Sequence, residues 1–257
     1  MRTEKAIALY AVAVFALSAA LAPWLFWVVH TFGDWPFRRV FNRVILVVAL
    51  VGLWPLSRSV GIRSWRELGY EPVMFRQLLA GLAIGIASYA AGMLSLCFTG
   101  NLWKCAAIGM VVALIEETFF RGGLQNVFQR RMPAWLAVAL VSVLYSVVHF
   151  LKPSGAHIPD VDVTWRSGFE YLGGVAASSF QEPGVWRRVV SLWLVGVVLG
   201  WAFVRTRTLY LSIGLHAGWV FAMKTLGGTL VDDPMIWPVL VVVLGGIEWW
   251  SRRKQTT

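Results

Sequence analysis

Long apolar runs recur along the whole chain, and they constrain the fold more than any other feature. A helix needs about 20 mostly apolar residues to cross the roughly 30 Å hydrocarbon core of a bilayer. Runs that approach this length lie at residues 6–30, 40–57, 77–98, 105–128, 134–152, 188–205, 208–225 and 235–250. The sequence therefore predicts an all-α fold, a polytopic membrane helix bundle with about eight transmembrane helices.

The composition supports a membrane protein and excludes several other classes. Of the 257 residues, 58% are hydrophobic and only 14% are charged, whereas soluble domains have about a quarter of their residues charged. The net charge of +10 comes from basic residues that lie between the apolar runs. Such residues bind anionic lipid headgroups and set the topology, so we expect the lipid bilayer, and no nucleic acid, as a partner.

The basic residues also predict an orientation in the membrane. With eight spans both termini lie on one side, and that side carries fourteen of the 23 Lys and Arg residues. The positive-inside rule then places both termini in the cytoplasm. An Ala20-Leu21-Ala22 tripeptide resembles a signal-peptide cleavage site, but Pro23 would follow the cut. We therefore expect an uncleaved first span in a multi-pass integral membrane protein.

Two hydrophilic segments interrupt the spans. Residues 58–76 are basic and combine polar with apolar side chains, and we expect an interfacial helix with Trp65 at headgroup depth. Residues 153–187 form a longer segment of the kind that often carries a helix of its own. Three small-xxx-small pairs predict close helix packing: Gly81 with Gly85, Gly196 with Gly200, and Gly214 with Gly218.

A pair of carboxylates stands inside one of the apolar runs. Glu116 and Glu117 lie within residues 105–128, with Arg121 shortly after them. Charged residues at mid-membrane cost about 2.5–3.5 kcal/mol each on insertion scales, and they usually mark function. Glu117 and Arg121 have the i,i+4 spacing of an ion pair, whereas Glu116 projects about 100° away. This spacing favours Glu117–Arg121 as a fixed pair and Glu116 as the reactive carboxylate; the alternative is a purely structural salt bridge.

Two histidines in other apolar runs narrow the chemistry. His149 shares a helix face with Tyr145, and His216 lies in the middle of the seventh run. A desolvated carboxylate can take a proton from water and return it to a leaving amine, while imidazoles orient the water or donate to an oxyanion. These groups predict peptide-bond hydrolysis by an activated water. Glu116, His149 and His216 would also suit a zinc ion whose fourth ligand is water.

Three motifs in order resemble those of the CAAX protease and bacteriocin-processing (CPBP, or Abi) family of intramembrane proteases. Residues 116–122, Glu-Glu-Thr-Phe-Phe-Arg-Gly, resemble the EExxxR motif of that family. Residues 142–149 resemble the second motif, an aromatic residue four positions before a histidine, with Tyr145 where Phe is usual. Residues 211–219 resemble the third motif, HxxxN. The resemblance divides the chain into N-terminal helices with an interfacial segment (1–104), a catalytic core (105–225), and a C-terminal helix with a basic tail (226–257).

The resemblance implies a role for each site residue. Glu116 would activate water with help from His149, His216 would stabilise the tetrahedral oxyanion, and Glu117 and Arg121 would hold the shape of the site. Such an enzyme is a CAAX-type endopeptidase in a membrane, here the bacterial inner membrane, that cuts membrane-associated proteins or peptides. The resemblance favours a metal-independent glutamate protease over a zinc enzyme.

One residue departs from the third motif. Val220 stands where the family commonly has Asn or Asp, which removes a hydrogen-bond donor near His216. An alternative is therefore a catalytically weak homologue that serves as a bacteriocin-immunity or scaffold protein. A proton-coupled transporter would use the same buried charges as a relay, but the sequence has none of the internal repeats typical of transporters.

Overall fold

The computed structural model confirms the all-helical fold. It describes residues 3–59, 61–72, 74–91, 101–150, 158–178, 184–226 and 236–253, and this part of the chain contains helices and turns but no strand. Helices at Lys5–His30, Phe37–Ser59 and Val185–Thr206 are long and apolar enough to cross a membrane. Three shorter apolar helices, Phe75–Ala91, Ala134–His149 and Trp237–Trp249, accompany them. The total of eight spans remains a prediction.

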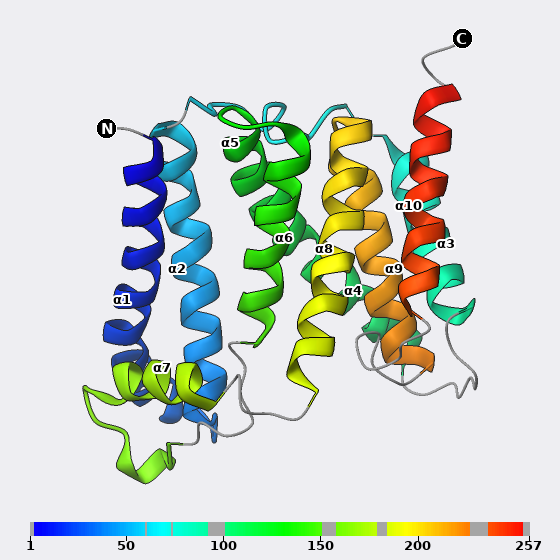
Figure 1. The fold of residues 1–257 in the computed structure, drawn as a ribbon. Coiled ribbons are helices and arrows are strands. Elements are labelled where there is room, and N and C mark those ends of the chain that lie inside the picture. The colour runs from blue at the N-terminus through cyan, green and yellow to red at the C-terminus, as the bar shows by residue number, and fades with distance from the viewer. Residues whose placement is uncertain are drawn as a thin grey trace. The chain divides into compact units, whose positions relative to one another are not determined.

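The chain divides into two compact units, and the first contains residues 1–63 and 148–185. In this unit α1 (Thr3–His30) and α2 (Phe37–Ser59) run antiparallel, and α7 (Ser167–Ser178) lies across their ends (Figure 1). Tyr171 of α7 is buried, with its ring centroid 4.8 Å from that of Phe41. The segment 153–187 thus carries its own helix, as expected; residues 151–157 and 179–183 lie outside the described part.

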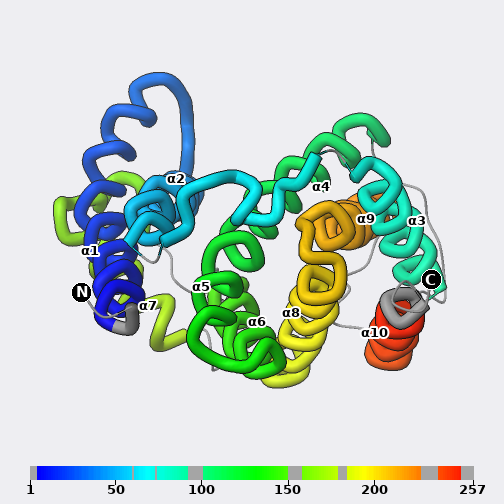
Figure 2. The backbone as a smooth tube through the Cα atoms, turned by 90° about the horizontal axis from the view of Figure 1, so that it is seen from above, coloured from blue at the N-terminus to red at the C-terminus, as the bar shows by residue number. Residues whose placement is uncertain are grey.

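The second unit contains residues 64–147 and 186–257, and it holds the predicted diglutamate. Its helices are α3 (Phe75–Ala91), α4 (Leu102–Glu117), a π-helix η1 (Thr118–Gln125), α5 (Asn126–Gln129), α6 (Ala134–Phe150), α8 (Val185–Thr206), α9 (Tyr210–Leu226) and α10 (Ile236–Arg253). Helix α9 is buried along most of its length and lies beside α3 and α4 (Figure 2). It is therefore the central helix of this unit. Helices α6 and α8 each extend across the division, since Val148 and Val185 count with the first unit.

Glycines bring α9 and α3 into backbone contact. A Cβ atom placed on Gly81 would lie 2.5 Å from the carbonyl oxygen of Leu211, and one on Gly85 would lie 2.5 Å from that of Leu215. Gly214 and Gly218 of α9 approach the backbone of α3 in the same way. No larger residue fits at this distance, which confirms the packing role predicted for these two pairs. The contact fixes the position of α9.

The segment between α2 and α3 differs from the prediction. Its described residues, 61–72, form turns and irregular structure, so the expected interfacial helix is wrong. Local turn bonds, such as that from the Tyr70 N–H to the Trp65 carbonyl, are joined by two tertiary bonds: the carbonyl of Gly69 accepts from the backbone N–H of Leu209, and that of Glu71 accepts from the Tyr210 hydroxyl. The tertiary bonds tie the segment to the start of α9.

Candidate active site

The diglutamate lies where an α-helix changes into a π-helix. Glu116 and Glu117 are the last two residues of α4, and η1 begins at Thr118. π-helical turns are rare and occur frequently at functional sites. Gly122 permits the turn to pack closely, because a Cβ atom there would lie 2.8 Å from the carbonyl oxygen of Leu68.

The predicted ion pair is present and fully buried. Arg121 Nη1 lies 3.2 Å from Glu117 Oε1, and the two side chains are 1% and 0% exposed. Arg121 also donates from Nη2 to the carbonyl oxygen of Gly196 on α8, at 3.1 Å. Its guanidinium carbon lies 4.7 Å from the ring centroid of Tyr145, a cation–π contact. These contacts anchor η1 to α8 and α6.

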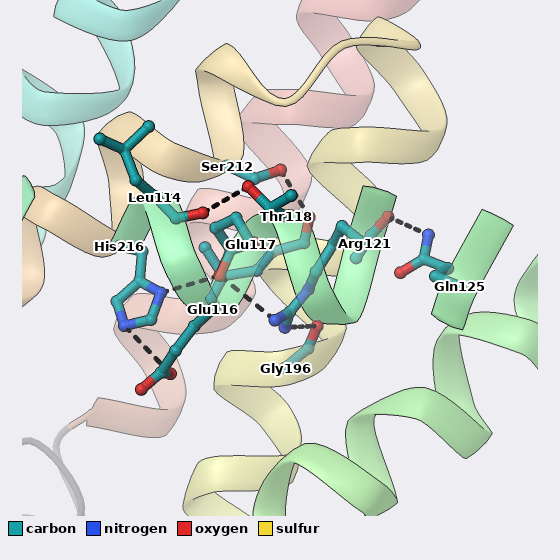
Figure 3. A network of polar contacts seen from close by, with 11 residues as sticks. Leu114, Glu116, Glu117, Thr118, Arg121, Gln125, Gly196, Ser212 and His216 are labelled. Atoms are coloured by element: carbon teal, nitrogen blue, oxygen red, sulfur yellow. Dashed lines mark hydrogen bonds and ion pairs between the residues drawn. The ribbon is translucent and has the colours of Figure 1, made fainter. Parts of the chain in front are cut away.

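His216 lies between the two carboxylates (Figure 3). Its Nδ1 is 2.8 Å from Glu117 Oε1, and its Nε2 is 3.8 Å from Glu116 Oε2. Since a carboxylate paired with a guanidinium only accepts hydrogen bonds, the network assigns the proton of Nδ1 to the bond with Glu117. Nε2 then faces Glu116. The sequence pointed to Arg121 as the partner of Glu117 but missed that Glu117 also holds His216.

Exposure distinguishes the two glutamates. The Glu116 side chain is 21% exposed, whereas that of Glu117 is 0% exposed and that of His216 is 6% exposed. Glu117 accepts from both Arg121 and His216 through Oε1, so its carboxylate is already occupied by two donors. Of the two carboxylates, Glu116 is therefore the one that a water or a substrate can reach more easily.

The charges of this group can balance in two ways. Glu117 and Arg121 neutralise each other, so the group is neutral overall when one further proton is held by either Glu116 or His216. With the proton on His216 the group contains an imidazolium and a carboxylate, and with the proton on Glu116 both groups are neutral. The net charge is the same in both states, so a proton can move between them without an uncompensated charge, which would be costly in a buried site.

The two remaining predicted residues lie on α6. Tyr145 is buried, and its ring stands edge-on to that of His216 with the centroids 6.3 Å apart. His149 lies one turn further along the helix and is half-buried. The division between the units falls between Val147 and Val148, so His149 counts with the first unit, and its role beside Glu116 stays a prediction.

Two features predicted near His216 are a zinc site and the lack of a hydrogen-bond donor at Val220. Among the residues that the structure describes, no three His, Cys, Asp or Glu side chains are arranged to hold a metal ion. The geometry of the described residues thus gives no support to the zinc set of Glu116, His149 and His216. Val220 lies near α4, with its Cβ 3.7 Å from the position a Cβ would take on Gly109.

Comparison with known proteins agrees with the motifs. Residues 98–222 match the family model of the type II CAAX prenyl endopeptidase Rce1-like proteins. This range includes the diglutamate, Arg121, His149 and His216. No curated protein matches the chain. The resemblance found in the sequence is therefore confirmed for residues 98–222, the part of the chain that matches a model of the CAAX protease family.

Proposed function

We propose that this protein is an intramembrane endopeptidase of the CAAX type that hydrolyses peptide bonds through a water activated by Glu116. The observation that carries the proposal is the position of His216, with one ring nitrogen toward each carboxylate. The family match over residues 98–222 supports a protease, and this geometry supports the assignment of the groups.

The reaction would use the proton that Glu116 and His216 share. Glu116 in its ionised state takes a proton from water, and the resulting hydroxide attacks the carbonyl carbon of the substrate. His216, protonated at that stage, donates from Nε2 to the developing oxyanion. Glu116 then delivers its proton to the leaving amine. Glu117 keeps the imidazole oriented through Nδ1, and Arg121 keeps Glu117 in place; His149 would assist Glu116 in positioning the water.

The membrane setting follows from the same reasoning. We infer eight spans with both termini in the cytoplasm, a location in the bacterial inner membrane, and a catalytic core over residues 105–225 between flanking regions 1–104 and 226–257. The substrates would be membrane-associated proteins or peptides, because the carboxylates lie within apolar helices. The proposed scheme uses no cofactor.

The decisive experiment uses the full chain reconstituted with candidate membrane peptides. Glu116→Gln keeps the shape of the side chain but removes the base, and we expect turnover to fall by a factor of about 10² to 10⁴. Glu170→Gln, which changes an exposed carboxylate on α7, is the matched control and should retain turnover. Turnover of Glu116→Gln within about threefold of the wild type would refute the assignment, since acid–base catalysis is worth more.

A second function is favoured by one observation. Val220 offers no hydrogen-bond donor one turn from His216, so the oxyanion would be less well stabilised. The chain would then be a weak protease whose role is to bind membrane peptides, as an immunity or scaffold protein. In that case the cellular phenotype should survive Glu116→Gln, whereas a protease should lose it.

A further inference from the structure

Four buried polar atoms recur at every fourth residue from the end of α4 through η1 to the end of α5. They are Glu117 Oε2, Arg121 Nε, Gln125 Oε1 and Gln129 Nε2. Each of these atoms is buried and has no hydrogen-bond partner among the residues that the structure describes. A buried polar atom without a partner is costly, and a run of four along one stretch of helix needs an explanation.

The atoms alternate in chemical character. Glu117 Oε2 and Gln125 Oε1 accept hydrogen bonds, whereas Arg121 Nε and Gln129 Nε2 donate them. The orientation of the Gln125 amide is set by its Nε2, which donates to the carbonyl oxygen of Gly200 at 3.0 Å. A water molecule can accept from one such atom and donate to the next, so successive atoms along the stretch are complementary to water.

The burial of these side chains gives the stretch a direction. Glu117, Arg121 and Gln125 are 0%, 0% and 1% exposed, whereas Gln129 is half-buried. Helix α5 ends at Gln129, and the exposed Arg130 follows directly. The stretch therefore leads from the ion pair of the candidate active site to the surface at the end of α5.

The neighbouring helix α8 packs closely against this stretch through its glycines. Arg121 and Gln125 donate to the carbonyls of Gly196 and Gly200 on α8. A Cβ atom on Gly200 would lie 2.7 Å from Gln125 Oε1 and 3.1 Å from Cγ1 of Val138. Val138 is 2% exposed, so this apolar side chain lies buried next to the middle of the polar stretch.

We propose that the stretch Glu117–Arg121–Gln125–Gln129 binds a file of water molecules that supplies the hydrolytic water from the end of α5. Bound water satisfies all four atoms, as buried water does in other proteins, and the inner end of the stretch is Glu117, the residue next to Glu116. The claim that this water is consumed rests on the proposed protease function, but the claim that water is bound there does not.

The test is hydroxyl-radical footprinting of the intact protein in nanodiscs, because radicals formed in bound water label buried side chains beside it. We expect Val138 to be labelled in the wild type, whereas Leu240, which is 1% exposed and lies on α10, stays protected. Gln125→Leu should abolish the labelling of Val138. Gln77→Leu, which makes the same change at a half-buried glutamine bonded to Thr208, should leave it unchanged.

A second variant covers the case in which Gln125→Leu does not fold. Gln129→Leu changes the half-buried end of the stretch, and it should also reduce the labelling of Val138. With an active preparation, the same variant should lower kcat and leave KM unchanged, because substrate contacts remain. If Val138 is as well protected from labelling as Leu240 in the folded wild type, the proposal is overturned. Labelling as expected in a protein that cuts no peptide would instead contradict only the protease function.

Discussion

Replacing Arg121 by methionine tests how much the buried ion pair contributes to stability. Methionine fills much of the same volume but has no charge, so Arg121→Met leaves the Glu117 carboxylate buried without its guanidinium. Breaking a buried pair by removing one partner generally costs about 3–5 kcal/mol. His216 still donates to Glu117 at 2.8 Å, which limits the loss, whereas the bond to Gly196 adds about 0.5–1.5 kcal/mol. We expect the free energy of unfolding to fall by about 3–4 kcal/mol.

The chain offers a matched control in a second arginine–glutamate pair. Arg205 on α8 binds Glu248 on α10 with its Nε 2.7 Å from Glu248 Oε2, but these side chains are 28% and 25% exposed. Ion pairs that water reaches contribute about 0.2–1 kcal/mol. Arg205→Met should therefore cost about 1 kcal/mol or less, although it removes the same chemical group.

Equilibrium unfolding in mixed micelles measures both variants, and a double variant makes the test sharper. Adding Glu117→Gln to Arg121→Met removes both charges while the amide oxygen still accepts from His216. Because paired charges can often be replaced together at little cost, the double variant should recover at least half of the lost free energy. The reasoning fails if Arg121→Met costs no more than Arg205→Met, or if the second substitution only adds to the loss.

Three further predictions concern packing, the missing donor and the metal. Gly214→Ala should lower the free energy of unfolding by about 1–3 kcal/mol, because its Cβ would meet the Leu78 carbonyl, whereas Gly245→Ala has nothing within 4 Å and should not destabilise. Val220→Asn should preserve or raise turnover, because it adds a donor one helical turn from His216; a folded variant with reduced turnover would contradict that role. Turnover should survive chelation, and about one zinc per chain, lost together with activity, would establish a zinc site instead.

The sequence predicted most helices because length and hydropathy determine them in a membrane. The runs 6–30, 40–57 and 188–205 correspond to α1, α2 and α8 within a few residues. The run 105–128 is helical throughout, but its π-helical part was not predicted. Hydropathy carries no information on whether a carbonyl accepts from the fourth or the fifth following residue, since that choice depends on packing against neighbours such as Leu68.

The irregular segment between α2 and α3 was misread for a related reason. Its composition resembles that of an interfacial helix, but its local backbone bonds form only turns, and another bond joins Gly69 to Leu209, far away in the sequence. Local patterns cannot predict bonds of this kind. Within the candidate site the same distinction holds: the i,i+4 spacing identified Glu117 and Arg121, whereas the contact of Glu117 with His216 joins residues 99 positions apart.

The structure supplies a reason for two adjacent glutamates. A single carboxylate that binds Arg121 is occupied by strong donors, so it cannot also bind a catalytic water without giving up those contacts. Glu117 is occupied in this way by Arg121 and His216. In the proposed mechanism a second carboxylate accepts the proton, and Glu116, 3.8 Å from Nε2 and partly exposed, has the environment for that role. His216 lies between the two, so the fixed pair would orient the imidazole next to the proposed base. The proposed mechanism thus gives a reason for the adjacency of the two glutamates, since it places both next to one imidazole.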